Sequence, residues 1–124
     1  MQIDRIKVFN ELKPLLKEYQ PLLNVKSDFE GRYELYSTRP LMYEGKHKEE
    51  VFFSSLIVQS NYVSFHFMPI YTHPQAFESV SDEMKRMLKG KSCFHIKKFD
   101  SKTKDDIKHI LEQGYAIYND IGLT

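Results

Sequence analysis

Hydrophobic residues recur every three or four positions along the first 23 residues of the chain. They are Ile3, Ile6, Phe9, Leu12, Leu16, Tyr19 and Leu23. This spacing places them along one side of a helix, so the segment predicts an amphipathic helix with one buried face. Because proline has no backbone N–H, we expect the helix to kink at Pro14 or to restart there, and Pro21 to mark its end.

From Phe29 onward the pattern changes to one that is typical of strands. Residues 32–37 alternate weakly, and residues 51–59 and 62–68 are runs of β-branched and aromatic side chains. Only Ser60-Asn61 separates the last two runs, which predicts a hairpin with a two-residue turn. The segments Arg39-Pro40 and Glu44-Gly45-Lys46 have the composition of turns or loops.

Side chains alternate between the two faces of a strand, so residues 62–68 divide into two sets. Val63, Phe65 and Phe67 form an apolar set that belongs in a core. The other face carries Tyr62, Ser64, His66 and Met68 and is half polar. The next segment, Met68 to Pro74, contains two prolines, which exclude regular strand pairing.

The rest of the chain predicts a short helix, a strand and a long helix. Ser81 has the character of an N-cap, and Gly90 ends the short helix. The strand from Ser92 places Phe94 and Ile96 on one face and Cys93, His95 and Lys97 on the other. Thr103 opens the last helix, whose buried stripe consists of Ile107, Ile110, Leu111, Gly114, Ile117, Tyr118 and Ile121.

Together these elements predict an α+β fold. It has an antiparallel sheet with the N- and C-terminal helices packed on one face, in the order α-β-β-β-α-β-α. The 124 residues, of which 41% are hydrophobic, correspond to a single domain over residues 1–124.

Charge and cysteine content exclude several classes of protein. The 18 Lys and Arg nearly balance the 17 Asp and Glu, which disfavours nucleic acid as a partner, although a local basic patch remains compatible with the composition. No apolar run reaches the roughly 20 residues of a membrane span, so we expect no membrane partner. The single cysteine cannot form an internal disulfide, and the expected compartment is the cytoplasm.

The segment Gly90-Lys91-Ser92 matches the end of a phosphate-binding loop but lacks its context. Such a loop follows a strand and opens a helix, and its first glycine would fall at position 85, which is Lys85. Here a helix precedes the segment and a strand follows it. We therefore do not expect a nucleotide triphosphatase.

Two blocks of the sequence resemble one family. Residues 84–95 (MKRMLKGKSCFH) resemble the K-R-M-x-G-K-S-C-F signature of the YdhG-like domains of unknown function, and residues 61–71 (NYVSFHFMPIY) are similar to the pattern Y-V-S-x-H-x-M-P-x-Y of that family. The resemblance covers roughly residues 52–118. It implies a small α+β domain related to the frataxin-like and YjbR-like architectures.

Some relatives of that family are described as intracellular iron chaperones, so the resemblance also implies iron as an alternative ligand. Frataxin-type iron binding is associated with a dense acidic ridge, since iron prefers oxygen ligands. The first helix of this chain carries only Asp4, Glu11 and Glu18, interspersed with Arg5, Lys7, Lys13 and Lys17.

The candidate binding residues gather on the half-polar face of the sheet and in the loop that follows it. The predicted ligand-binding residues are His66, Met68, Tyr71, His73, Lys91, Cys93 and His95. If their two strands are neighbours, His66, Cys93 and His95 could converge as metal ligands, which is the alternative role of these three residues. The ordinary interpretation is a half-exposed face with amphipathic side chains.

Other clusters permit further interpretations. Cys93 could be a nucleophile with His95 as its base, although no acid is placed to orient the histidine and a buried, inert thiol fits better. The aromatic residues Tyr33, Tyr36, Tyr62 and Tyr71 could line a pocket or fill space. The cations Lys89, Lys91, Lys97, Lys98, Lys102 and Lys104, with Phe94 and Phe99 among them, could hold an anion, although Asp100, Asp105 and Asp106 dilute the cluster.

The sequence therefore predicts a non-enzymatic cytosolic domain that binds a small molecule or a protein partner on the open sheet face and needs no cofactor. A frataxin-like metal chaperone and a Cys/His-dependent enzyme are the alternatives. The uncovered face and the edge strands could also support a homodimer.

Overall fold

The computed structural model of the chain describes residues 4–20, 22–37, 41–43, 46–48 and 51–122. The expectations for Ile3, Pro21, Arg39-Pro40 and Glu44-Gly45 lie outside these residues.

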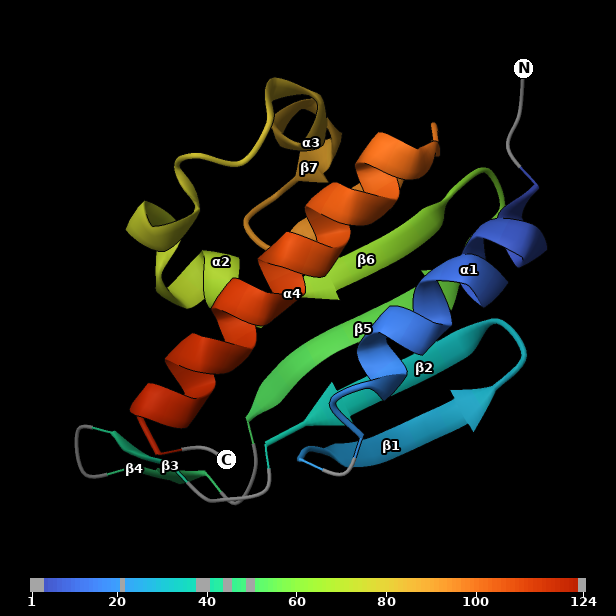
Figure 1. Cartoon of the computed structure of the whole chain (residues 1–124). Helices are drawn as coiled ribbons and strands as arrows, with labels where there is room; N and C mark the ends of the chain where they lie inside the picture. The colour runs from blue at the N-terminus through green and yellow to red at the C-terminus, as the bar shows by residue number, and fades with distance from the viewer. Residues whose placement is uncertain (1–3, 21, 38–40, 44–45, 49–50, 123–124) are drawn as a thin grey trace.

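The main sheet contains β1 (Asn24–Phe29), β2 (Arg32–Tyr36), β5 (Phe52–Val58), β6 (Val63–Phe67), β7 (Leu88–Lys89) and β8 (Cys93–Ile96). The helices are α1 (Arg5–Lys17), α2 (Met68–Thr72), the 3-10 helix η1 (Pro74–Phe77), α3 (Asp82–Met87) and α4 (Ser101–Asp120). A separate hairpin pairs β3 (Leu41–Tyr43) with β4 (Lys46–Lys48). Figure 1 shows this arrangement from the side of the helices.

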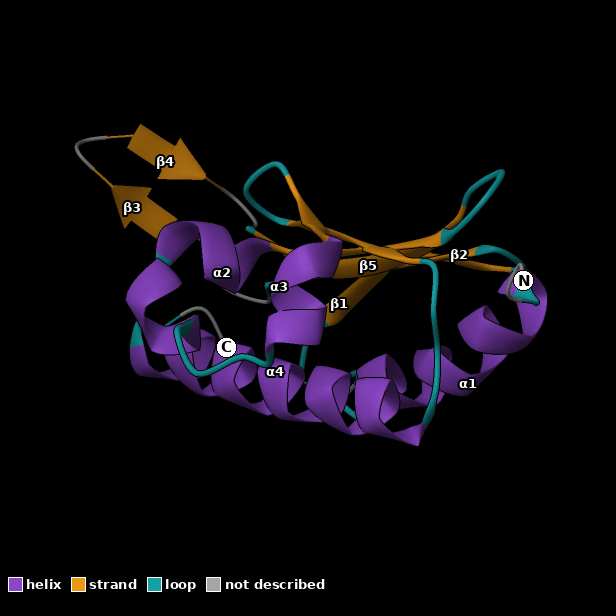
Figure 2. Ribbon diagram, turned by 90° about the horizontal axis from the view of Figure 1, so that it is seen from above, coloured by secondary structure: helices purple, strands orange, loops and turns teal. Residues whose placement is uncertain are grey.

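The six strands of the main sheet lie in the order β1-β2-β5-β6-β8-β7, and each neighbouring pair is antiparallel. Figure 2 shows α1 and α4 together on one side of the sheet, while the β3–β4 hairpin lies beyond one end of the strands on the other side. The structure confirms the predicted fold class, an antiparallel α+β domain with its terminal helices packed on one face.

Helix α1 forms because its apolar stripe can be buried against the sheet and because its first turn is capped. The carboxylate of Asp4 accepts a hydrogen bond from the backbone N–H of Lys7, at 3.1 Å, and so caps the first turn. Pro14 lies inside the helix and neither ends nor restarts it. Both Asn10 and Pro14 are exposed, so water can bind the Asn10 carbonyl that has lost its N–H partner.

The core lies between the sheet and the two long helices. The buried strand residues on this side include Tyr33, Leu35, Phe53, Leu56, Val63, Phe65, Phe67, Phe94 and Ile96. They meet Val8, Phe9, Leu12 and Leu16 of α1 and Ile107, Ile110, Leu111 and Tyr118 of α4. The predicted alternation of β6 and β8 is therefore correct. Tyr33 belongs to this core, where its hydroxyl donates to Oε1 of Gln20 at 3.1 Å, and it lines no pocket on the other face.

Several elements were not anticipated from the sequence. The strands β3, β4 and β7 and the helices α2 and η1 have at most 5 residues each. Strand β1 is longer, but it has an irregular burial pattern with a bulge between Val25 and Ser27. A bulge interrupts the alternation by which a strand is recognised. Strand β6 ends at Phe67, and Met68 begins α2 rather than continuing the strand.

Two predicted helix boundaries are also corrected. Ser81 caps α3 as expected, because its hydroxyl accepts from the N–H of Met84 at 3.2 Å. However, α3 ends at Met87, and Gly90 lies in the turn between β7 and β8, where its φ is +67°. Helix α4 is capped by Asp100, whose carboxylate accepts from both the N–H and the hydroxyl of Thr103. Thr103 is thus inside the helix, at the third position.

Gly114 permits close contact between α4 and the sheet. A Cβ atom placed on Gly114 would overlap Cζ of Phe67 and lie 3.0 Å from Cγ of Pro69. Phe67 is fully buried and contacts the rings of Phe53, Phe65 and Phe77. The helix can therefore approach β6 only because this position has no side chain.

We expect the Gly114→Ala substitution to lower the free energy of unfolding by about 2 kcal/mol. The added methyl must displace a buried ring, and this strain exceeds the roughly 1 kcal/mol that alanine gains over glycine in helix propensity. Urea denaturation measures the effect. In a double-mutant cycle, Phe67→Leu should relieve part of the loss. A Gly114→Ala protein more stable than the wild type would contradict the packing described here.

Candidate functional site

The face of the sheet opposite α1 and α4 brings together three of the residues predicted for binding. In the pairing of β6 with β8, His66 lies directly opposite Cys93, and His95 lies opposite Ser64. Directly paired residues share a face, so both imidazoles and the thiol lie on the open face as predicted. We call the surface formed by His66, Cys93, His95 and their neighbours on this side the open face.

Rings from neighbouring strands surround the two histidines. The rings of Tyr62 and His95 are stacked, with centroids 4.0 Å apart and planes 15° apart. His66 lies edge-on to Phe52 at 6.5 Å, and Phe52 in turn contacts Tyr36 at 5.4 Å. The open face thus carries two aromatic groups, one around His66 and one around His95.

The environment of the two histidines favours their neutral forms. Burial lowers the pKa of His66, and the nearby His95 and Arg32 lower it further, while Glu34 acts in the opposite direction. Burial, with Lys97 and Lys89 nearby, also lowers the pKa of His95. Glu34 cannot offset the other effects because its carboxylate is held at 2.8 Å by Arg32 and at 2.9 Å by Ser27.

Cys93 has the surroundings of an inert thiol. Its side chain is half-buried, and burial raises the pKa of the thiol. Its Sγ lies 4.0 Å from the carbonyl oxygen of Phe94, which is at most a weak hydrogen bond. Reactive cysteines have a lowered pKa instead.

The remaining predicted residues lie elsewhere. Met68 is the half-buried first residue of α2. His73 ends α2, where its Nδ1 lies 2.8 Å from the hydroxyl of Thr72. Tyr71 and Lys91 face each other across a separate groove, with the amine of Lys91 5.6 Å from the centre of the Tyr71 ring. The predicted set therefore divides between the open face and this groove.

The groove lies between the α2–η1 segment and the α3–β7 segment. Its volume is about 690 Å³, and it is lined by Ile70, Tyr71, Pro74, Phe77, Glu78, Lys85, Leu88 and Lys91. The amine of Lys85 donates to the backbone carbonyl of Glu78 at 2.7 Å and so spans the two sides. We call this hollow the Tyr71 groove. Its residues were missed by the sequence analysis, except for Tyr71 and Lys91, because they belong to four elements with no common periodicity.

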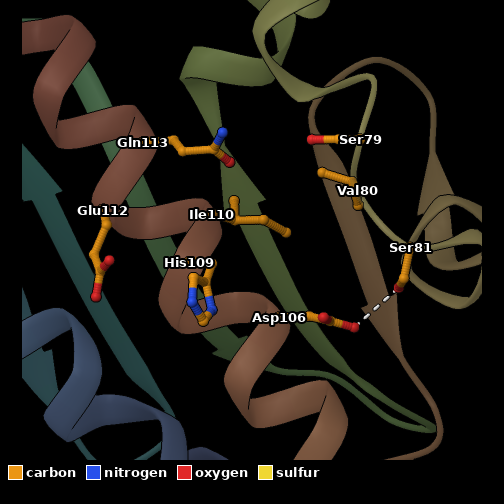
Figure 3. A pocket seen from close by; sticks show the side chains of 8 residues that line it. All are labelled: Ser79, Val80, Ser81, Asp106, His109, Ile110, Glu112 and Gln113. Carbon is orange, nitrogen blue, oxygen red and sulfur yellow. Dashed lines mark hydrogen bonds between the residues drawn. The ribbon is translucent and has the colours of Figure 1, made fainter.

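Two smaller hollows lie beside α4 and α3. The first, of about 360 Å³, is polar and separates α4 from residues 79–81, with the hydroxyl of Ser81 donating to Asp106 at 2.9 Å (Figure 3). The second, of about 240 Å³, is basic, and it is lined by Glu83, Arg86, Met87, Lys89, His95, Lys97 and Lys98.

The Gly90-Lys91-Ser92 segment lies in the turn of the β7–β8 hairpin. No helix begins behind it, because the residues that follow enter β8. A phosphate-binding loop requires the N–H groups of such a helix. This segment instead joins two strands, and the helix predicted directly before it ends earlier, at Met87.

Among the described residues, no three His, Cys, Asp or Glu side chains are grouped closely enough to hold a metal ion. Within the same part of the chain, no helix is both long and apolar enough to cross a membrane.

Comparison of the chain with protein-family models, with curated protein sequences and with solved structures finds no match. The resemblance to YdhG-like domains thus stays a prediction that rests on the two sequence blocks.

We expect the stability of the protein to decline as the pH falls below about 6.5, the ordinary pKa of histidine. Because the pKa of His66 is lowered in the folded state, the unfolded chain binds more protons in this range. The stabilisation is complete above pH 6.5 and is lost on acidification toward the folded-state pKa. Urea denaturation at pH 7.5 and 5.5 measures this change, and His66→Gln should reduce it.

The window from pH 7.5 to 5.5 lies above the range in which carboxylates titrate, so Asp and Glu contribute little to the difference. His109→Gln, on the exposed side of α4, is the matched control. An unchanged pH dependence in the His66 variant would show that this histidine does not carry the effect.

We expect Cys93 to react more slowly with Ellman's reagent at pH 7.5 than free cysteine does. Both its half-buried position and its raised pKa lower the fraction of accessible thiolate. The rate measured in native protein is compared with the rate in urea, where it should rise. Equal rates in both conditions would identify a more reactive thiol than the surroundings of Cys93 indicate.

Proposed function

We propose that the protein is a binding domain whose ligand is a small organic anion with an apolar body, held in the Tyr71 groove. The observation that carries this proposal is the combination, in one hollow of about 690 Å³, of an apolar wall and two amines. This volume falls within the range of ordinary small-molecule sites.

The wall of the groove supports an apolar ligand body. Ile70, Phe77 and Leu88 contribute aliphatic and aromatic surface, and the ring of Tyr71 is 51% exposed beside them. Phe77 is itself buried and packs on Phe67, so this part of the wall is fixed by the core. A site that exists before binding costs a ligand little ordering free energy.

The two lysines support a negative group on the ligand. Lys91 lies over the face of Tyr71, and the amine of Lys85 lies at the carbonyl of Glu78. The carboxylate of Glu78 also borders the groove, so the charge balance favours one carboxylate or sulfonate over a multiply charged ligand.

A binding role is also favoured over catalysis by the surroundings of the candidate nucleophile. The raised pKa of Cys93 keeps its thiol protonated. Covalent catalysis by cysteine needs the thiolate and a neighbouring base that is itself oriented by a third group. We therefore place the ligand of this domain in the groove and assign no reaction to the open face.

We expect 8-anilinonaphthalene-1-sulfonate, an apolar anion, to bind the native protein with increased fluorescence and to be displaced by decanoate. Lys91→Gln should weaken binding roughly five-fold, the equivalent of about 1 kcal/mol for one partly exposed charge contact. Tyr71→Ala should weaken it as well, through loss of the apolar wall. Titration at constant ionic strength measures both.

Lys108→Gln, on the exposed surface of α4, is the matched control and should bind as the wild type does. Equal affinities for the Lys91 and Lys108 variants would refute the assignment of the anion to the groove. Fluorescence that decanoate does not reverse would point to non-specific binding and would also refute it.

A further inference from the structure

The open face combines aromatic rings with positive charge. Six rings lie on this face. They belong to Phe29 of β1, Tyr36 of β2, Phe52 of β5, Tyr62 just before β6, His66 of β6 and His95 of β8. Phe29 is 58% exposed, and the other five rings are half-buried. These side chains therefore lie along the surface of the sheet with part of each ring accessible.

The charges on the same face are mostly positive. Arg32 and Lys89 share the face with Glu34 and Cys93, because they pair with residues of this face or alternate with them along the strands. Lys97 follows His95 by two positions. Among the described strand residues on this side, Glu34 is the only carboxylate, and Arg32 and Ser27 already hold it.

The positive charge extends from the open face around its β7–β8 edge. Residues 85–98 contain six Lys and Arg and no Asp or Glu, in a chain whose net charge is +1, so the rest of the chain carries −5. Arg86, Lys89, Lys97 and Lys98 line the basic hollow together with His95 and one carboxylate, Glu83, which lies 3.6 Å from the amine of Lys98. Such a local concentration attracts polyanions even when the whole protein is nearly neutral.

The stacked pair of Tyr62 and His95 lies where the aromatic rings of the open face meet the basic hollow. The two rings stack face to face with centroids 4.0 Å apart, so each can offer a base only its outer face, and His95 also borders the basic hollow. The second aromatic group, around His66 and Phe52, lies on the same face. Tyr62, which precedes β6, lies four residues before His66, or about 13 Å in a strand, whereas His95 is a diagonal neighbour of His66 across the β6–β8 pair.

We infer that the open face binds single-stranded nucleic acid, with unpaired bases stacked on the rings and the phosphates along the β7–β8 edge. Bases of any sequence stack on aromatic side chains, and lysine and arginine neutralise the backbone. The rings of Tyr62 and His66, about 13 Å apart along the chain in extended form, would contact separate bases of one oligonucleotide. Binding requires positive charge only where the phosphates lie, so the near-zero net charge of the whole chain does not oppose it.

Fluorescence anisotropy of labelled 12-nucleotide oligo(U) and oligo(dT) tests the inference, and the two oligonucleotides distinguish RNA from DNA as the source. We expect binding that weakens with salt. Tyr62→Ala should weaken it about 5- to 150-fold, the range for loss of one stacked base. Because this half-buried ring could also affect folding, each variant is first compared with the wild type by circular dichroism.

A second variant avoids the aromatic rings. The double substitution Lys89→Gln/Lys97→Gln removes two exposed charges, and it should make the log–log slope of affinity against salt shallower by about 1.4. The matched control is Lys17→Gln/Lys108→Gln, which removes two exposed charges from the helices on the other side and should leave affinity and slope unchanged.

Four results would overturn the inference. The first is that neither oligonucleotide binds at 50 mM salt, and the second is that the control pair loses as much affinity as the Lys89/Lys97 pair. The third is that a 12-base-pair duplex or poly-glutamate binds with the same affinity as the oligonucleotides. The fourth is that light scattering finds a dimer that Tyr62→Ala dissociates. The last would identify the open face as a contact between two copies of the chain. The groove proposal is independent, because the oligonucleotide variants leave Tyr71 and Lys91 intact.

Discussion

The contact between Gly114 of α4 and Phe67 of β6 is the constraint on which the rest of the structure depends. Because Gly114 has no Cβ, the helix lies directly on the Phe67 ring, and that ring contacts Phe53, Phe65 and Phe77. A few residues farther along α4, the hydroxyl of Tyr118 donates to the carbonyl of Phe52, and burial raises the pKa of Tyr118. These contacts seal one side of the sheet, and the other side is not covered by α1 or α4.

The same packing positions both surfaces to which we assign a ligand. Phe77 joins the core at Phe67 and forms part of the wall of the Tyr71 groove. Strand β6 presents Phe67 to α4 and the adjacent His66 to the open face. The two surfaces therefore have a common rigid support but different chemistry, since the groove is apolar with two amines and the open face is aromatic with a basic edge.

The candidate residues were predicted with uneven success, and the reason is geometric. His66, Cys93 and His95 were placed together because alternation within two strands decides their face, and the strands proved to be neighbours. Tyr71 and Lys91 were named, but their partners Phe77, Lys85 and Leu88 come from other elements. Phe94 lies among the clustered lysines along the sequence, but its side chain is buried in the core, as the alternation of β8 predicts. No local pattern indicates which loops meet in space.

The sequence by itself determined the fold class, most of the buried sides of α1 and α4, and the two faces of the β6 and β8 strands, because each depends on a period within one segment. Ile6 and Ile121, which the same periods predict to be buried, are 39% and 45% exposed, because each lies at the end of its helix, beyond the core. Tertiary structure alone decided the strand order, the bulged β1 edge, the course of α1 through Pro14 and the formation of the groove. These features depend on contacts between segments that are distant along the chain, and the free energy of such contacts overrides weak local preferences.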